Sequence, residues 1–263
     1  MSMDFGFKGK TALVLASSQG LGKAIATRLV EEGADVMITS RNEEKLIDVA
    51  NQLNALGKGK AAFIKTDITS KEEISRLVKQ TIKEFGKIDL LVNNAGGPPA
   101  GGFEQMTDED WQNAFELNLL SYIRTIREIL PHMKQRGGKI VNIASSSVKE
   151  PIPGLILSNT FRLGIVGLTK TLATEFAKYD ILINTASPGR IATERIDQLE
   201  EWNAAKLGIP KEEIKNKYLE AIPLNRYGEP NEFANYVLFL LSDLNTYMTG
   251  QTFLIDGGLV KSI

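Results

Sequence analysis

A strand, a turn of small residues and a helix follow one another near the start of the chain, and this order constrains the fold most. Residues 11–16 form an apolar run that predicts a strand, and a helical pattern begins at Gly20. The turn between them would leave backbone N–H groups free at a helix start, where glycines let an anion approach closely. Such a turn also simply joins a strand to a helix, so alone it leaves nucleotide binding open.

The same alternation continues along the whole chain. Apolar runs predict further strands at residues 34–39, 61–66, 88–92, 139–143, 181–186 and 252–255. Helical patterns lie between them at residues 42–56, 70–85, 108–133, 158–178 and 230–242. This order predicts a Rossmann-type α/β fold, with a doubly wound, parallel, seven-stranded sheet between two helical layers. Because no linker or repeat divides the 263 residues, we interpret residues 1–263 as one domain.

A charged, helix-prone segment interrupts this pattern at about residues 194–223. It follows the sixth predicted strand, and ligands of such sheets bind at the carboxyl ends of the strands. The segment could therefore be a mobile lid over a ligand. A solvated surface excursion is the alternative.

The composition argues against several classes of function. The 31 Lys and Arg residues nearly balance the 32 Asp and Glu residues, so nucleic acid is not an expected partner. The chain has no cysteine and one histidine, His132, which we place at the surface, so no metal site is expected. No apolar run approaches the ~20 residues of a membrane span, and residues 1–10 lack the apolar core of a signal peptide. These features predict a cytoplasmic protein with no membrane partner.

Small and polar residues follow several predicted strands directly. Asn93 to Gly97 follow the fourth strand, Ala144 to Ser147 the fifth, and Ser187 to Thr193 the sixth. The carboxyl ends of parallel strands meet at one edge of a sheet, so these segments should lie together.

Taken together, these motifs resemble the short-chain dehydrogenase/reductase family over nearly the whole chain, from Lys10 to Leu259. The resemblance implies a seven-stranded sheet, an NAD(H) or NADP(H) cofactor and commonly a homotetramer. It assigns the pyrophosphate and adenosine ribose to Ser17, Gln19, Gly20, Leu21 and Gly22, and the adenine to Asp67 and Ile68. It assigns contacts to the ribose and the cofactor backbone to Asn94, Ala95 and Gly96. It assigns the nicotinamide carboxamide to Pro188, Gly189, Ile191 and Thr193. The family's first glycine is Ala16 here, so we expect a slightly altered turn.

The end of the second predicted strand bears on the choice of cofactor. An NAD site usually places a carboxylate there, whereas an NADP site removes it and offers an arginine. Here Ser40 is followed by Arg41, with no acid at Thr39 or Ser40. A guanidinium suits a 2′-phosphate, so NADP(H) is favoured over NAD(H). Arg41 as a solvated loop cation is the alternative.

The family's reaction centre is conserved here only in part. Asn118 matches its asparagine, which supports a water relay, and Ser145 matches its serine, which bonds the substrate oxygen. The family's Tyr-x-x-x-Lys pair is replaced by Ser158 and Arg162, and no Tyr-x-x-x-Lys occurs anywhere in the chain. The chain thus resembles an atypical branch whose members are labelled 3-oxoacyl-acyl-carrier-protein reductases.

The replacement changes the acid–base chemistry. A serine hydroxyl is a far weaker acid than a phenol, and arginine stays protonated, so Ser158 should not act as an ordinary general acid. Losing general acid–base catalysis costs ~10²–10⁴-fold in rate. Arg162 could bond the nicotinamide ribose, stabilise an oxyanion or hold a substrate carboxylate or phosphate. Alternatively, it turns outward and pairs with an acid. A water held by Asn118, Ser145 and Ser158 could deliver the proton.

We therefore hypothesise an NADP(H)-dependent oxidoreductase that interconverts a carbonyl and an alcohol, on a small molecule or a 3-oxoacyl thioester. One alternative is a non-catalytic NADP(H)-binding scaffold that has lost the Tyr/Lys pair. Another is a dehydrogenase whose acid comes from the insertion, such as Tyr218.

Overall fold

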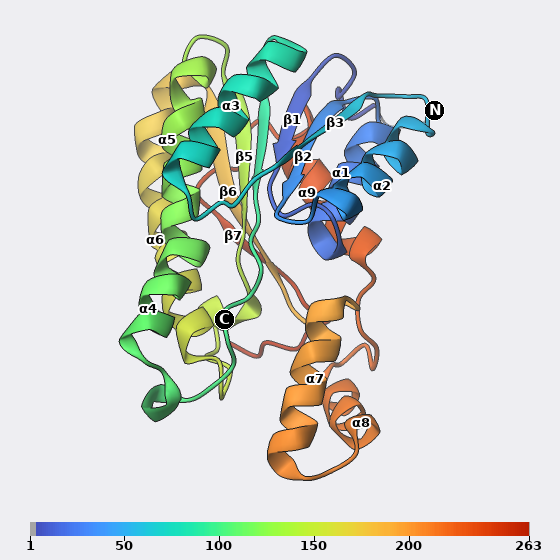
Figure 1. Cartoon of the computed structure of the whole chain (residues 1–263), viewed down its shortest axis with the longest axis vertical. Helices are drawn as coiled ribbons and strands as arrows, with labels where there is room; N and C mark the ends of the chain where they lie inside the picture. The colour runs from blue at the N-terminus through green and yellow to red at the C-terminus, as the bar shows by residue number, and fades with distance from the viewer. Residues whose placement is uncertain (1–3, 263) are drawn as a thin grey trace.

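The computed structural model describes residues 4–262, which are built around a seven-stranded sheet (Figure 1). The strand order is β3-β2-β1-β4-β5-β6-β7, and all neighbouring strands are parallel. The doubly wound parallel sheet predicted from the sequence is confirmed. The strands are β1 (Thr11–Val14), β2 (Asp35–Ser40), β3 (Ala61–Lys65), β4 (Leu90–Asn93), β5 (Gly138–Ile143), β6 (Ile181–Pro188) and β7 (Thr252–Ile255).

Helices cover both faces of the sheet (Figure 1). One face carries α1 (Gly20–Glu31), α2 (Glu43–Asn54) and α9 (Pro230–Leu241). The other carries α3 (Lys71–Phe85), α5 (Ser121–Met133) and α6 (Ile156–Phe176). Successive residues of a strand point to opposite faces, so Val14 packs in the first core and Leu13 in the second. Strands covered on both faces are apolar throughout, which explains the continuous apolar runs in the sequence.

Most predicted elements begin and end within two residues of the observed ones. The expected helix starts are also present, since Ser70 and Thr107 accept hydrogen bonds from the backbone N–H groups of Glu73 and Asp110. The helix predicted at 108–133 is present, but it is not regular throughout. It consists of α4 (Asp108–Phe115), a π-helical turn (Glu116–Leu120) and α5.

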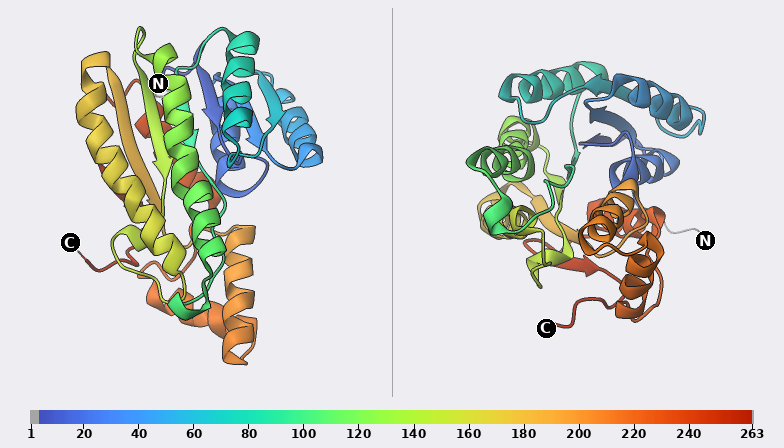
Figure 2. Two further views of the ribbon diagram at one scale, coloured as in Figure 1. Left: turned by 60° about the vertical axis from the view of Figure 1, so that its left-hand side comes forward. Right: turned by 60° about the horizontal axis from the view of Figure 1, so that its bottom comes forward.

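The segment after β6 contains two helices, α7 (Glu194–Leu207) and α8 (Lys211–Ala221). They project beyond the carboxyl ends of the strands, as Figures 1 and 2 show. Gly208, in the left-handed conformation with φ of 65°, ends α7 and allows the chain to turn into α8. Within residues 4–262, no helix is long and apolar enough to cross a membrane.

Candidate active site

The turn after β1 is tightly packed against the start of α1. Ala16 has a φ of 47°, so an alanine holds a left-handed conformation that usually favours glycine. A Cβ atom added to Gly22 would lie well inside contact distance of the Ala16 carbonyl oxygen, and 2.9 Å from Asn94 Nδ2. The turn therefore keeps its left-handed backbone despite the alanine, and glycine at residue 22 lets α1 approach the strand.

The first turn of α1 has no side-chain cap, and the Glu194 carboxylate at the start of α7 lies 3.8 Å from a Cβ added to Gly20. Gln19 precedes the helix without capping it through its side chain, and no acidic residue lies in the first turn. By contrast, α3 is capped by Ser70 and carries Glu72 and Glu73 in its first turn. Uncapped N–H groups and the positive end of the helix dipole together attract an anion.

Ser17 plays a structural part in this turn. Its side chain is fully buried, and its hydroxyl donates to the Val14 carbonyl oxygen over 2.8 Å. The Ser17 hydroxyl oxygen in turn accepts a hydrogen bond from the Thr39 backbone N–H over 2.9 Å. The Ser17 side chain thus ties β1 to β2, rather than facing the carboxyl edge of the sheet. Leu21, another predicted cofactor residue of this turn, is half-buried against the α1 side of the core.

The end of β2 carries no acidic side chain. Ser40 bonds the backbone of Asn42 through its hydroxyl, and Arg41 is exposed. Lys45, in the first turn of α2, donates to Gln19 Oε1 over 2.6 Å. Lys45 therefore brings a second cation between the α1 turn and the end of β2. The sequence interpretation missed it, because the contact joins residues in separate elements.

Asp67 and Ile68 follow β3. The Asp67 carboxylate accepts hydrogen bonds from the Thr69 backbone N–H and hydroxyl, over 2.9 and 2.8 Å. Ile68 is buried in the core on the α3 side. The carboxylate thereby shapes the loop that follows the strand.

The asparagines at the end of β4, Asn93 and Asn94, hold adjacent strands together. Asn93 donates to Asn142 Oδ1 of β5 over 2.9 Å, and Asn94 donates to the Ala16 carbonyl oxygen over 3.1 Å. This is the strand-linking role that two amides at a strand end can fill. It leaves the loop at Ala95 and Gly96 beside the turn after β1.

Asn118 lies in the π-helical turn and is fully buried. Its Nδ2 donates to the Gly96 carbonyl oxygen over 2.7 Å, whereas its Oδ1 makes no hydrogen bond to any of residues 4–262. A π-turn adds one residue to the helix, and such turns are frequent at functional sites. Here the extra residue brings the amide to the loop after β4.

Ser145 and Ser158 lie in the segment after β5 and at the start of α6. Ser145 is half-buried, and its hydroxyl accepts a hydrogen bond from the Ser147 backbone N–H over 3.1 Å. Ser158, in the first turn of α6, is 9% exposed.

Arg162 is buried one turn after Ser158, with 5% of its surface exposed. Its Nη1 donates to the Ile143 carbonyl oxygen over 2.8 Å and to the Tyr122 hydroxyl over 3.0 Å, and its Nη2 donates to the Ala95 carbonyl oxygen over 3.1 Å. The cation is therefore fixed between the ends of β4 and β5. The alternative that Arg162 turns outward and pairs with an acid is wrong.

Tyr122 is a partner of Arg162 that sequence reasoning missed. Its phenol is fully buried and donates to the Ile143 carbonyl oxygen over 2.9 Å. Burial raises the pKa of Tyr122, although the charge of Arg162 acts in the opposite direction. The phenol therefore stays protonated and holds the guanidinium in place. Its spacing of four residues from Asn118 was the available signal, but the irregular helix obscured it.

Arg195, in the first turn of α7, was also missed. Its Nη2 donates to the Pro98 carbonyl oxygen over 2.8 Å. Its guanidinium lies against Gly97, where an added Cβ would lie 2.6 Å from Nε. Burial lowers the pKa of Arg195, and the positive charge of Arg162 lowers it further. Both guanidinium groups donate to carbonyl oxygens of the loop after β4.

The segment after β6 is anchored by the backbone. Pro188 ends β6, and the Gly189 N–H donates to the Ile255 carbonyl oxygen over 2.9 Å. Ile191 is buried and forms a parallel bridge with Gly228. Thr193 precedes α7, and its hydroxyl donates to the Ile191 carbonyl oxygen over 3.2 Å.

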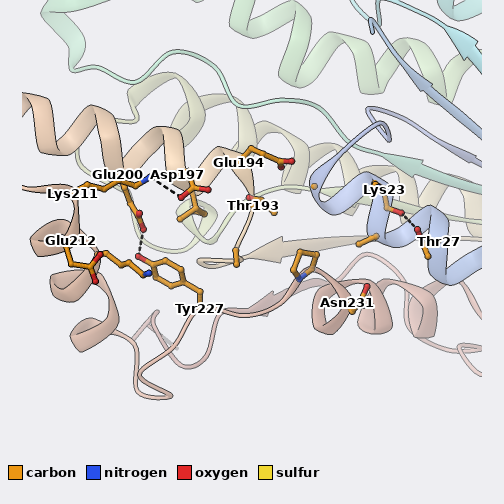
Figure 3. A pocket seen from close by; sticks show the side chains of 16 residues that line it. Lys23, Thr27, Thr193, Glu194, Asp197, Glu200, Lys211, Glu212, Tyr227 and Asn231 are labelled. Carbon is orange, nitrogen blue, oxygen red and sulfur yellow. Dashed lines mark hydrogen bonds and ion pairs between the residues drawn. The ribbon is translucent and has the colours of Figure 1, made fainter. Parts of the chain in front are cut away.

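A pocket of about 910 Å³ lies between the first half of α1, the two insertion helices and the start of α9 (Figure 3). Charged residues of both signs line it, including Lys23, Glu194 and Lys211. Glu200 is 2% exposed and accepts a hydrogen bond from the Tyr227 hydroxyl over 2.6 Å. Of the predicted site residues, this pocket holds only Gly20 and Thr193.

The comparisons with known proteins agree with this geometry. A family model described as "Enoyl-(Acyl carrier protein) reductase" matches residues 15–260. The chain is 36% identical over 258 residues to the 3-oxoacyl-[acyl-carrier-protein] reductase FabG of Aquifex aeolicus, covering 98% of this chain and 100% of that protein. This chain belongs to the short-chain dehydrogenase/reductase family.

Solved structures of other short-chain dehydrogenase/reductases have the same fold. L-sorbose reductase from Gluconobacter frateurii, complexed with NADPH and L-sorbose, matches with a TM-score of 0.94 and 31% identity, over 99% of this chain and 100% of that one. A 7α-hydroxysteroid dehydrogenase complexed with NADH matches with a TM-score of 0.91 and 29% identity, over 100% of this chain and 99% of that one. Relatives of this shape thus bind either dinucleotide, so the choice here depends on the chain's own residues.

Measured against the family pattern, the site divides into two parts. Asn118, Ser158 and Arg162 are buried side chains, and Ser145 is half-buried. Arg162 and Asn118 converge on the loop at Ala95 and Gly96. Ala95 and Gly96 are themselves predicted cofactor residues, so the two parts meet at this loop. The other predicted cofactor residues lie along the carboxyl edge, in and after the ends of β1, β2, β3, β4 and β6.

Proposed function

We propose that this short-chain dehydrogenase/reductase is an NADP(H)-dependent oxidoreductase that interconverts a carbonyl and an alcohol. The substrate is a small molecule or an acyl thioester such as a 3-oxoacyl chain. The observation that carries the proposal is the buried Arg162, which holds a fixed positive charge at the ends of β4 and β5, four residues from Ser158.

The residues present fit a dinucleotide. The uncapped first turn of α1 offers N–H groups for the diphosphate, and Gly22 allows the backbone to pack closely there. Arg41 and Lys45 provide cations for a 2′-phosphate, with no carboxylate at the end of β2. Asn94, Ala95 and Gly96 would contact the ribose and the cofactor backbone. The nicotinamide carboxamide would be held by Pro188, Gly189, Ile191 and Thr193. A bound nicotinamide supplies the hydride.

The chain's own groups supply orientation and charge. Ser145 would hydrogen-bond the substrate oxygen, and the fixed Arg162 charge would stabilise negative charge that develops there. Ser158 would orient the proton donor, rather than act as the acid itself. The unpaired, buried Oδ1 of Asn118 is an acceptor suited to hold a water that delivers this proton.

The experiment is an NADPH oxidation assay on ketones, sugars and 3-oxoacyl thioesters, together with equilibrium binding of NADPH and NADH. We expect turnover with at least one carbonyl class and tighter binding of NADPH. Ser158→Ala and Arg162→Met should each lower kcat by at least ten-fold while NADPH still binds. Bound NADPH that no carbonyl oxidises would contradict the proposal.

A non-catalytic scaffold is the second candidate, and one observation favours it. Arg162 already donates three hydrogen bonds to protein acceptors, which is also a structural role. The discriminating variant is Ser158→Tyr with Arg162→Lys. Activity created by this pair in an inactive protein would favour the scaffold, whereas damage to an existing activity would favour the enzyme.

Two further parts of the proposal concern the insertion and assembly. The helices α7 and α8 would act as a lid, as one segment of a single domain spanning 1–263. If the acid came from this lid, Tyr218→Phe would abolish turnover, and an unchanged rate would exclude it. In the structure, the Tyr218 ring lies beneath the guanidinium of Arg190, with its centroid 3.2 Å from the Arg190 Cζ.

We also propose a homotetramer, testable by light scattering in solution.

A further inference from the structure

The loop after β4 is held by three side chains from three other elements. The carbonyl oxygen of Ala95 accepts from Arg162 over 3.1 Å, that of Gly96 from Asn118 over 2.7 Å, and that of Pro98 from Arg195 over 2.8 Å. Holding a backbone carbonyl requires only a neutral donor, as Asn118 shows. The bonds to the loop therefore do not explain why two of the three donors are charged guanidinium groups.

The two arginines bond carbonyl oxygens three residues apart on the same loop, and neither has an acidic partner among the residues that the structure describes. Among residues 4–262, neither Arg162 nor Arg195 forms an ion pair with a carboxylate. Burial and the charge of Arg162 both lower the pKa of Arg195, which reflects the cost of keeping two like charges close in a partly dry environment. An anion between them would remove that cost.

We propose that Arg162 and Arg195 together bind an anionic group, a carboxylate or a phosphate, of the carbonyl substrate. This inference rests on the proposed function and specifies its substrate class. A guanidinium has five N–H donors; Arg162 uses three hydrogen bonds and Arg195 uses one. Donors therefore remain on both for charge-assisted hydrogen bonds to the planar or tetrahedral oxygens of such a group.

Gly97 supports the assignment of Arg195 to this site. An added Cβ there would lie 2.6 to 2.7 Å from the Nε, Cζ and Nη2 atoms of Arg195, so only glycine lets the guanidinium lie on the loop. Because Arg195 belongs to α7, an anion held by both arginines would also connect the insertion to the end of the sheet. Binding of the substrate would then favour the position of α7 seen here.

The cofactor diphosphate is the other source of the same anionic chemistry. The start of α7 lies near the turn that would hold it, since Thr193 Cγ2 is 3.7 Å from a Cβ added to Gly20. The loop contacted by Arg195 follows β4 instead, next to the carbonyl bound by Arg162. This position favours the substrate.

The test measures equilibrium binding to the full-length protein saturated with NADP⁺, so that turnover does not interfere. The probes are matched pairs: 3-oxobutyrate with 3-oxobutyramide, and dihydroxyacetone phosphate with dihydroxyacetone. We expect the anionic member of at least one pair to bind at least ten-fold more tightly. Arg195→Gln should reduce this preference at least ten-fold and change NADPH affinity less than two-fold.

Two variants complete the design. Gly97→Ala should displace the Arg195 guanidinium and reduce the preference while the chain keeps its charge. Lys206→Gln removes a positive charge from the same helix, over the Trp202 ring, and should leave the preference unchanged. Circular dichroism checks that each variant is folded.

The outcomes separate the two proposals. A preference below ten-fold in both pairs, or equal loss in Lys206→Gln, would overturn the two-arginine site. Weaker NADPH binding in Arg195→Gln would assign that cation to the cofactor, and would also overturn it. Anion preference without any turnover would leave the site standing and contradict the oxidoreductase function.

Discussion

Residue 22 must be glycine because identifiable atoms of neighbouring residues occupy the space that a side chain would need. A side chain there would collide with the Ala16 carbonyl oxygen and approach Asn94 Nδ2 and Ser17 Cα, both at 2.9 Å. These neighbours are backbone or tightly bonded groups, so they cannot move aside at low cost. Gly167, on the exposed side of α6, has no atom within 4 Å of an added Cβ.

These two glycines make a matched pair for a stability experiment. Gly22→Ala should lower the free energy of unfolding by about 1–3 kcal/mol through overpacking, and should weaken NADPH binding. Gly167→Ala should raise the free energy of unfolding by about 0.5–1 kcal/mol, because alanine favours a helix over glycine. Urea unfolding measures both. Equal effects of the two substitutions would contradict the packing described for the turn.

For single residues, sequence patterns predicted which element carries each candidate residue, but they did not predict its hydrogen-bond partners. The spacing from Ser145 to Ser158 and Arg162 predicted their places after β5 and on α6. It could not indicate that Arg162 bonds Tyr122, 40 residues earlier, or that Arg195 reaches back 97 residues to Pro98. Such contacts depend on how distant elements pack, which no local spacing encodes.

At the scale of elements, the helix from 108 to 133 marks the limit of a periodicity argument. An unbroken helical pattern predicts one regular helix, whereas the structure has a π-turn at Glu116–Leu120. Within this turn Asn118 donates to the Gly96 carbonyl oxygen, a tertiary contact that a local periodicity does not encode. Helix starts were predictable because capping is local.

The start of α9 provides a pH-dependent test. Arg226 donates to both carboxylate oxygens of Glu232, over 2.8 and 2.7 Å, and these bonds, with that from the Glu229 N–H, lower the pKa of Glu232 to about 2. A carboxyl with a depressed folded-state pKa stabilises the fold above its unfolded pKa. That contribution is lost as the pH falls from about 4.5 to about 2.

Glu232→Gln should therefore lower the melting temperature modestly at pH 7, since the pair is exposed. The difference from the unmodified protein should shrink as the pH falls below about 4.5 and vanish near pH 2. Thermal unfolding followed by circular dichroism at pH 7, 4 and 3 measures this. A difference that stays constant with pH would rule out the carboxylate as its source.

At the scale of the whole molecule, the sheet was predictable and the placement of α7 and α8 was not. The alternation of strands and helices fixes the parallel sheet, because crossovers have one hand and buried strands are apolar. The charged insertion carries no such pattern. Its position depends on a few specific contacts, among them the partly buried hydrogen bond from Tyr227 to Glu200.

Tyr227→Phe tests that contact. Burial and the Glu200 hydrogen bond raise the pKa of Tyr227, so the phenol stays protonated and donates. Without it, the buried Glu200 carboxylate loses a donor at a cost of about 1–3 kcal/mol. We expect backbone hydrogen exchange in α7 and α8 to be at least roughly ten-fold faster than in the unmodified protein. Exchange in β1 and α1 should be unchanged.

Tyr236→Phe is the control for this experiment, because the Tyr236 ring packs against Phe239 and Phe253 within the α9 side of the core. It should leave exchange in α7 and α8 as it is. If Tyr227→Phe also changes nothing there, the contact to Glu200 does not hold the insertion.

The strand order has a consequence for synthesis on the ribosome. β1 lies inside the sheet, β2 and β3 extend it in one direction, and β4 to β7 extend it in the other. Each strand therefore joins an edge whose neighbour has already been translated, and no strand must wait for a later one to fill a gap. A nascent chain could lengthen its sheet in step with translation, leaving one open edge for the next arrival.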